Sequence, residues 1–167
     1  MAETEKFELN KDGYLPQKRF KIDLKEFEDK FVYVDDTSKR EMLYEKYKSF
    51  CKRFEHIIIK VWVNGSYTTG KKLPGDIDMA VHFDALKFEN LSLMSLAEKQ
   101  AFTNREGIKK RYMLHSLLVP VYPNNHPAHA ITKMQSEKWE KLFFKDTRNN
   151  PPVIKGYVEL NNYLGVD

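Results

Sequence analysis

One pattern constrains this 167-residue chain more than any other: an apolar strand ends in a Gly-Ser turn, and two aspartates follow after nine intervening residues. The turn is Gly65-Ser66, and the aspartates are Asp76 and Asp78. Side chains at i and i+2 of a strand point to the same face, so the two carboxylates stand together while Ile77 points into the core. Such carboxylates repel each other unless a cation lies between them, and a hard divalent ion such as Mg²⁺ is the usual occupant of an all-oxygen site. The pattern therefore predicts two strands that carry a metal ion beside a phosphate-binding turn.

The composition is that of an ordinary globular domain, with 41% apolar and 31% charged residues. We expect a single domain over residues 1–167, with an N-terminal arm over residues 1–35 and a core over residues 36–167. No run of eighteen apolar residues could cross a membrane, and we expect no secretory signal at the N-terminus. The single cysteine, Cys51, cannot form an internal disulfide, which fits a cytoplasmic protein. The formal charge of +4 is compatible with phosphate-bearing ligands but does not by itself indicate nucleic acid.

The hydrophobic pattern predicts an α/β (α+β) fold, in which helices pack against a mixed β-sheet. Residues 7–30 are expected to form an extended arm that leads into a turn of helix. In the last predicted helix, Trp139, Leu142 and Phe143 are expected to face inward. The predicted strands cover residues 57–63, 77–83 and 114–122, and the predicted helices cover residues 38–54, 91–112 with a break near 104–107, and 132–144. Residues 155–160 are expected to form a short strand or the start of a helix.

Residues 65–71 also spell most of a phosphate-binding P-loop, Gly-x-x-x-x-Gly-Lys. In a P-loop the next residue is the Ser or Thr that binds Mg²⁺, but here it is Lys72. A P-loop must also open a helix, and Pro74 prevents one from beginning here. We therefore reject the P-loop and keep the Gly-Ser turn and the aspartate pair as the motif.

The spacing of an apolar residue, Gly-Ser, and then Asp-apolar-Asp resembles the signature of the DNA polymerase β-like nucleotidyltransferase superfamily. Nearly the whole chain is similar to a family of small, stand-alone, mostly bacterial and phage nucleotidyltransferase-like proteins of unassigned function. The wider superfamily includes minimal nucleotidyltransferases that act as antitoxins, some by adenylylating a partner toxin. The segments that carry the narrower resemblance are residues 13–16, 39–40, 62–67, 74–78 and 155–160.

This resemblance implies that Gly65 and Ser66 form the turn on the phosphate side of the site. It also implies that Asp76 and Asp78 bind Mg²⁺, or Mn²⁺ in its place. Lys71 and Lys72 lie between the turn and the aspartates, where they could meet the triphosphate of an NTP substrate or an acidic partner. Lys109, Lys110 and Arg111 could do likewise, although charge runs of this kind are more often solvated helix faces.

Two-metal nucleotidyl transfer normally needs a third carboxylate from a neighbouring strand. The matching strand here has no Asp or Glu, and His115 or Ser116 stands at the expected position. A neutral imidazole is a poor ligand for Mg²⁺ but an acceptable one for Mn²⁺ or Zn²⁺. Three alternatives stay open: His115 acts as a general base, catalysis uses one metal, or the site binds nucleotide without turning it over. Glu159 could supply a more distant carboxylate if its segment folds beside the sheet.

The other histidines give weaker signals. His82 lies on the same strand face as the aspartates by parity, although a partly exposed structural residue is the commoner case. His126 and His129 lie in a Pro- and Asn-rich segment without an acidic or Cys partner at metal-ligand spacing, which predicts a solvated loop.

The resemblance implies a metal-dependent nucleotidyltransferase that moves a nucleoside monophosphate from an NTP to a hydroxyl of a protein, an RNA or a small molecule. The alternative is a catalytically degenerate binding module, antitoxin-like or part of a phage–host conflict, that acts through a protein or RNA partner. A third possibility is an α/β domain without nucleotide chemistry. The motif predicts the fold in the first two cases, and the residue at position 115 bears on which of them applies.

Overall fold

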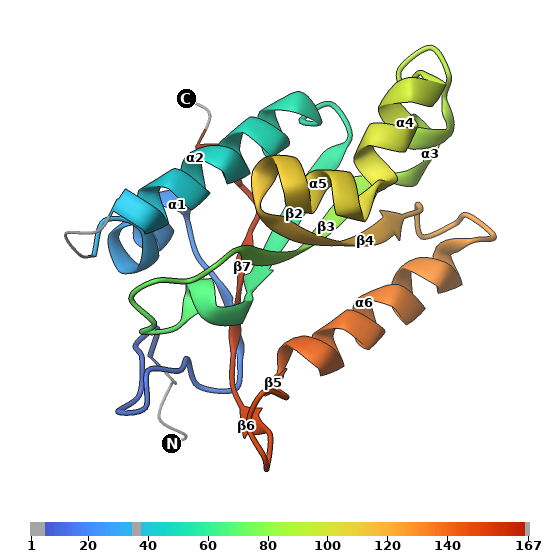
Figure 1. The fold of residues 1–167 in the computed structure, drawn as a ribbon. Coiled ribbons are helices and arrows are strands. Elements are labelled where there is room, and N and C mark those ends of the chain that lie inside the picture. Colours follow the sequence, from blue (N-terminus) through green and yellow to red (C-terminus); the bar gives the residue numbers. More distant parts are fainter. Residues whose placement is uncertain (1–5, 35–37, 166–167) are drawn as a thin grey trace.

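A computed structural model describes residues 6–34 and 38–165 and contains a five-stranded mixed sheet in the order β1-β7-β2-β3-β4 (Figure 1). The β1–β7 and β3–β4 pairs are parallel, and the other two pairs are antiparallel. This arrangement confirms the predicted mixed sheet. The five strands are β1 (Arg19–Lys21), β2 (Ile58–Asn64), β3 (Ile77–Asp84), β4 (Leu114–Val121) and β7 (Tyr157–Leu160), and a separate small sheet pairs β5 (Lys145–Asp146) with β6 (Val153–Ile154).

Helices cover both faces of the sheet. In Figure 1, α2 and α5 lie over one face and α6 lies over the other. The main apolar core lies between the sheet and α2, where Leu43, Tyr47 and Phe50 of the helix are buried. The helices are α1 (Leu24–Phe27), followed directly by a π-helical turn (Glu28–Val32), then α2 (Ser38–Arg53), α3 (Ala85–Glu89), α4 (Leu96–Thr103), α5 (Arg105–Tyr112) and α6 (His129–Phe143).

Several element boundaries differ from the sequence expectation. The break predicted near residues 104–107 is present, because Asn104 ends α4 and its side chain accepts a hydrogen bond from Gly107 N at the start of α5. Helix α6 begins three residues earlier than predicted. The prediction that Leu142 faces inward is wrong: its side chain is 47% exposed, whereas Phe143, one helical position further on, is buried.

The N-terminal segment is more integrated than an extended arm. Residues 19–21 form β1, an edge strand that pairs in parallel with β7, and Leu15, Phe27 and Phe31 are buried in the main core. Residues 1–5 and 35 of the predicted arm lie outside the described residues. The described part of the segment therefore packs against the last strand of the chain.

The face of the sheet that meets α6 carries the polar residues. A small cluster beneath α6 joins Trp62, Ala80 and Tyr157 of the sheet to Phe143 of the helix. Side chains alternate along a strand, so Asn64 lies on the same face as Trp62, and Asp78 lies on the same face as Ala80. The Gly-Ser turn and Asp78 therefore lie at the end of this face of the sheet, next to the C-terminal end of α6.

Candidate functional site

The Gly-Ser turn and the second aspartate lie in direct contact. Asn64, the last residue of β2, pairs with Asp78 of β3, and a short 3₁₀ turn begins at Gly65. Gly65 has φ +73°, and a Cβ at this position would lie 2.0 Å from Asp78 Oδ2. Only glycine satisfies both constraints, because the left-handed conformation is unfavourable for other residues and there is no space for a side chain. The spacing seen in the sequence therefore brings the turn against the carboxylate.

A buried arginine that the sequence did not single out as a site residue holds the loop after the turn. Arg40, in the first turns of α2, donates from Nη1 to the carbonyl oxygens of Phe31 (2.8 Å) and Tyr67 (2.7 Å). Its Nη2 donates to the carbonyl oxygens of Thr69 (2.9 Å) and Lys71 (2.6 Å). These bonds fix the backbone of the loop that contains the Gly-Ser turn. Arg40 is therefore a positioning residue that holds this loop in place.

The two aspartates interact electrostatically. Asp76 immediately precedes β3 and is half-buried, and Asp78 is the second residue of that strand. Burial raises the pKa of Asp76, and the negative charge of Asp78 raises it further, while the cations of Lys109 and Arg148 oppose this shift. A divalent cation between the two carboxylates would relieve the repulsion.

His115 is placed as predicted, next to Asp78 on the neighbouring strand. Its Nδ1 lies 3.0 Å from Asp78 Oδ1, and its Nε2 lies 2.8 Å from Arg105 Nη2. A guanidinium only donates hydrogen bonds, so Nε2 must accept, and Nδ1 must carry the proton that is donated to Asp78. In this arrangement the Nδ1–H of His115 points at Asp78 and orients its carboxylate. For His115 to act as a general base, the Arg105 contact would first have to break.

In the part of the chain that the structure describes, no third carboxylate joins the aspartate pair. Within residues 6–34 and 38–165, no cluster of three or more His, Cys, Asp or Glu side chains could hold a metal ion. Glu159 is occupied elsewhere, since it accepts a hydrogen bond from Trp62 Nε1 at 2.7 Å and lies within 4 Å of cationic side chains. Mg²⁺ commonly uses one or two carboxylates together with substrate phosphates and water. Asp76 and Asp78 fit that more modest requirement.

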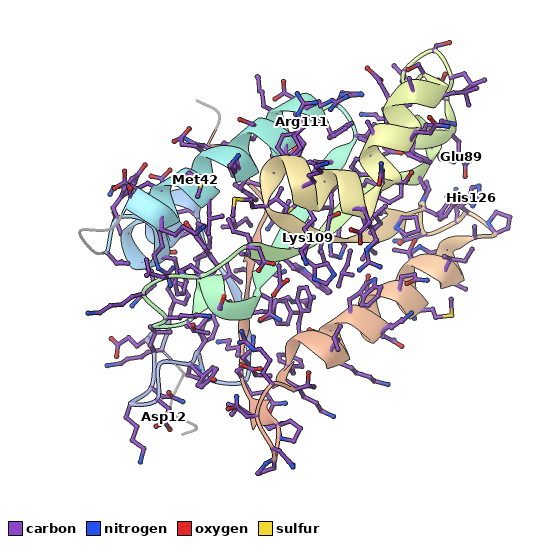
Figure 2. All side chains as sticks on the ribbon, in the orientation of Figure 1. Asp12, Met42, Glu89, Lys109, Arg111 and His126 are labelled. Carbon is purple, nitrogen blue, oxygen red and sulfur yellow. The ribbon has the colours of Figure 1, made fainter. Side chains whose placement is uncertain are left out.

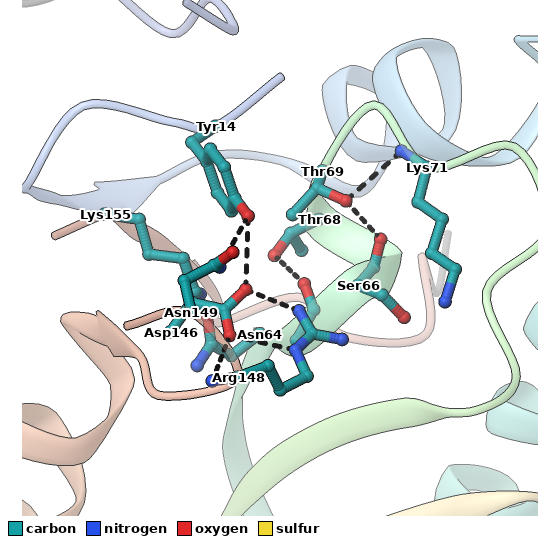
Figure 3. Close-up of polar contacts among 11 residues, drawn as sticks. Tyr14, Asn64, Ser66, Thr68, Thr69, Lys71, Asp146, Arg148, Asn149 and Lys155 are labelled. Carbon is teal, nitrogen blue, oxygen red and sulfur yellow. Dashed lines mark hydrogen bonds and ion pairs between the residues drawn. The ribbon is translucent and has the colours of Figure 1, made fainter. Parts of the chain in front are cut away.

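Sequence reasoning missed a second polar group, contributed by the segment between α6 and β7 (Figure 3). Asp146 is 4% exposed and accepts hydrogen bonds from Arg148 Nε (2.9 Å) and Nη2 (2.6 Å) and from the Tyr14 hydroxyl (3.3 Å). The Arg148 guanidinium lowers the pKa of the Asp146 carboxyl to about 2. Lys155, at 2% exposed, donates to Asn64 Oδ1. Lys155 opens the segment 155–160 that carries the narrower resemblance, but Asp146 and Arg148 lie in no segment that the sequence singled out.

Two cavities meet at this group. The larger, of about 560 Å³, includes Tyr14, Ser66 and Lys71 in its wall. The smaller, of about 220 Å³, has Gly65, Asp78, His115 and Lys155 in its wall. Asp146 and Arg148 line both. The larger cavity alone is within the size range of small-molecule sites, and the two together offer cations, carboxylates and a hydroxyl to a polar ligand.

Other candidate residues lie outside these cavities. Lys72 is exposed, and neither Lys72 nor Asp76 lines either cavity. His82 is on the predicted face but is buried against Trp62, with the ring centroids 4.4 Å apart, and burial lowers its pKa to about 3. The expectation of a partly exposed His82 was wrong.

His126 precedes α6 and His129 is the first residue of that helix rather than part of a loop, and both are structural. His126 stacks on the Tyr122 ring at 4.8 Å, and its Nδ1 accepts a hydrogen bond from Ala128 N. His129 Nδ1 lies 3.0 Å from the Tyr122 carbonyl oxygen. Figure 2 places His126 at the opposite end of the molecule from Asp12, which lines the larger cavity. These histidines therefore do not contribute to the site.

Comparison with known proteins identifies a family but no activity. Residues 7–161 match the model of a family of unknown function, DUF6932. No curated protein and no solved structure shows significant similarity to the chain. Among the described residues, no helix is long and apolar enough to cross a membrane.

Proposed function

Because the chain belongs to the DUF6932 family of unknown function, its activity has to be inferred from its own residues, and we propose that it is a Mg²⁺-dependent nucleotidyltransferase. The substrate is a nucleoside triphosphate, and the acceptor is a hydroxyl of a protein, an RNA or a small molecule. The fit of the Gly65 backbone against the Asp78 carboxylate carries the proposal. A turn and a metal-binding carboxylate in contact would place the phosphates of a nucleotide beside the ion that they share.

The charges around the cavities support a triphosphate as the ligand. Arg148 and Lys71 line the larger cavity beside the Ser66 hydroxyl, and all three can donate hydrogen bonds to phosphate oxygens. The backbone of this loop is held in place by Arg40, so the donors are preorganised before the ligand arrives. Asp78 lies against Gly65 of the turn and interacts electrostatically with Asp76, and these two carboxylates would hold the metal ion.

In the reaction, the acceptor oxygen forms a bond to the α-phosphorus as the bond from that phosphorus to the bridging oxygen of pyrophosphate breaks. The acceptor hydroxyl loses its proton to solvent, and pyrophosphate leaves. A Mg²⁺ ion held by Asp76 and Asp78 would supply neutralisation of the phosphate charge. His115 would keep the Asp78 carboxylate oriented through its Nδ1–H, as ligand-orienting hydrogen bonds do in metal sites generally.

Transfer of label from NTPs carrying ³²P in the α-phosphate tests the proposal. The protein is incubated with each NTP, Mg²⁺ or Mn²⁺, and a bacterial lysate that supplies acceptors. We expect label transfer by the wild type and a loss of about 100-fold or more in Asp78→Asn. Asp84→Asn is the matched control, because Asp84 ends the same strand and caps α3 away from the site. Transfer that survives in Asp78→Asn would contradict the proposal.

The second candidate function is a nucleotide-binding module without transferase activity, acting on a protein or RNA partner. One observation favours it: a histidine bound by Arg105 stands where a third acid is expected. In this case a nucleotide would raise the melting temperature of the wild type but not of Asp78→Asn, and no label would be transferred. An antitoxin-like or phage–host role belongs with this candidate, as does an RNA or toxin-like protein partner.

A further inference from the structure

A buried ammonium group lies in the smaller cavity near two carboxylates. Lys155 immediately precedes Gly156 and β7, and its side chain is enclosed in the fold. Asp78 and Asp146 line the same cavity and both attract the Lys155 charge, since each raises the pKa of this lysine. Burial is the larger influence and lowers the Lys155 pKa to about 8, so the group is mostly protonated at neutral pH.

The hydrogen bonding of Lys155 is incomplete. An ammonium group has three N–H donors. Among residues 6–34 and 38–165, Asn64 Oδ1 is the one acceptor within hydrogen-bond distance of Lys155 Nζ. A buried charged group with unused donors is costly unless a ligand or another partner completes it. The remaining N–H groups are therefore available to an oxygen atom in the cavity.

In two-metal transfer the second ion lowers the pKa of the attacking hydroxyl and stabilises charge on its oxygen. That ion needs carboxylates from more than one strand, but here His115 takes the position opposite Asp78, and Arg148 neutralises Asp146. The protein nevertheless has a positive charge in this region of the site, supplied by Lys155. This ammonium can stabilise negative charge as a fixed cation does, without a metal ion.

We propose that the Lys155 ammonium takes the place of the second metal ion, so that the site binds one divalent ion and Lys155 contacts the acceptor oxygen. The inference rests on the proposed function. As the acceptor oxygen bonds to the α-phosphorus and pyrophosphate leaves, the acceptor proton goes to solvent and Lys155 donates a hydrogen bond to the oxygen. Lys155 keeps its own proton throughout.

Counting bound Mn²⁺ by electron paramagnetic resonance tests this assignment without a catalytic readout. The full-length protein is titrated with Mn²⁺ in the presence of the non-reactive nucleotide α,β-methylene-ATP. We expect one bound ion in the wild type. Lys155→Ala removes the charge and opens space near Asp78 and Asp146, so we expect a second ion to bind. Lys155→Ser leaves similar space and serves as a second variant if the alanine variant fails to fold.

Lys145→Ala is the matched control. Lys145 lines the same cavity, but its side chain is exposed, so its removal subtracts one positive charge without opening the buried position. We expect Lys145→Ala to bind one ion, as the wild type does. We also expect the transfer rate of Lys155→Ala to depend on Mn²⁺ more steeply than that of the wild type, because a second ion must now bind.

The possible outcomes separate the inference from the proposed function. One ion in the wild type and two in either Lys155 variant support the inference. Two ions in the wild type, or one ion in both folded variants, overturn it and leave the proposed function standing. If no Mn²⁺ binds to the wild type with the nucleotide, or if binding persists in Asp78→Asn, the proposed function fails and the inference fails with it.

Discussion

Gly65→Ala is the substitution whose cost follows most directly from the geometry of the site. The left-handed backbone at Gly65 costs an alanine about 1–2 kcal/mol. The added Cβ would lie 2.0 Å from Asp78 Oδ2, so the carboxylate must move and weaken its hydrogen bond to His115. That bond joins two partly exposed side chains, so its loss costs about 1 kcal/mol or less. We therefore expect a destabilisation of about 1–3 kcal/mol.

Urea unfolding followed by tryptophan fluorescence measures this loss, and Gly75→Ala is the control. Gly75 lies in the same connection between β2 and β3, but a Cβ there would have no atom within 4 Å and its φ is not positive. We expect Gly75→Ala to stay within about 1 kcal/mol of the wild type, on the stabilising side. The reasoning is refuted if Gly65→Ala loses less than about 1 kcal/mol, or if both variants lose the same amount.

Three further predictions test other parts of the structure. Arg40→Met removes a buried cation that holds four backbone carbonyl groups, so we expect a loss of about 3–5 kcal/mol in urea unfolding, against less than about 0.5 kcal/mol for Lys39→Met. The low pKa of Asp146 stabilises the fold above about pH 4, and this contribution, on the order of 1–2 kcal/mol, is lost as the pH falls from about 4 towards 2. The free energy of unfolding of Asp146→Asn should lack that pH dependence. The same pH dependence in Asp146→Asn as in the wild type would contradict this prediction. His115→Ala should lower label transfer about 10–100-fold because Asp78 loses its orienting partner, whereas His129→Ala should transfer at the wild-type rate.

The central strands and the position of the motif could be predicted from the sequence because their signals are local. The β-branched run before Gly65 and the apolar residues after Asp76 indicate strands by composition alone. Parity along the strand then places Asp78 on the face opposite the main core. The adjacency of His115 and Asp78 followed from the expected order of strands, which the pairing of β3 with β4 confirms.

The remainder of the site depends on contacts between segments far apart in the chain. The strand β1 has three residues, too few for a periodic pattern, and is defined by its pairing with β7, more than 130 residues later. Asp146 and Lys155 enter the site through the short β5–β6 sheet, which also lacks a recognisable pattern. Burial of Lys155 could not be predicted from the sequence, because lysine is almost never fully buried.

The orientation of side chains on α6 shows the same limit at the level of one helix. Trp139 and Phe143 are four positions apart and share the face that meets the sheet, while Leu142 lies about 100° around the helix from Phe143. All three are apolar, so composition alone did not separate them. The exposed Leu142 instead lines the smaller cavity.

Calorimetric titration with α,β-methylene-ATP tests most directly whether the turn and the aspartates form a metal–nucleotide site. The analogue is titrated into the wild type and into Asp78→Asn, each with Mg²⁺ and with EDTA. We expect binding to the wild type that requires Mg²⁺ and is weakened at least about tenfold in Asp78→Asn. No binding by the wild type, or equal binding by both proteins with and without Mg²⁺, would contradict the proposed site.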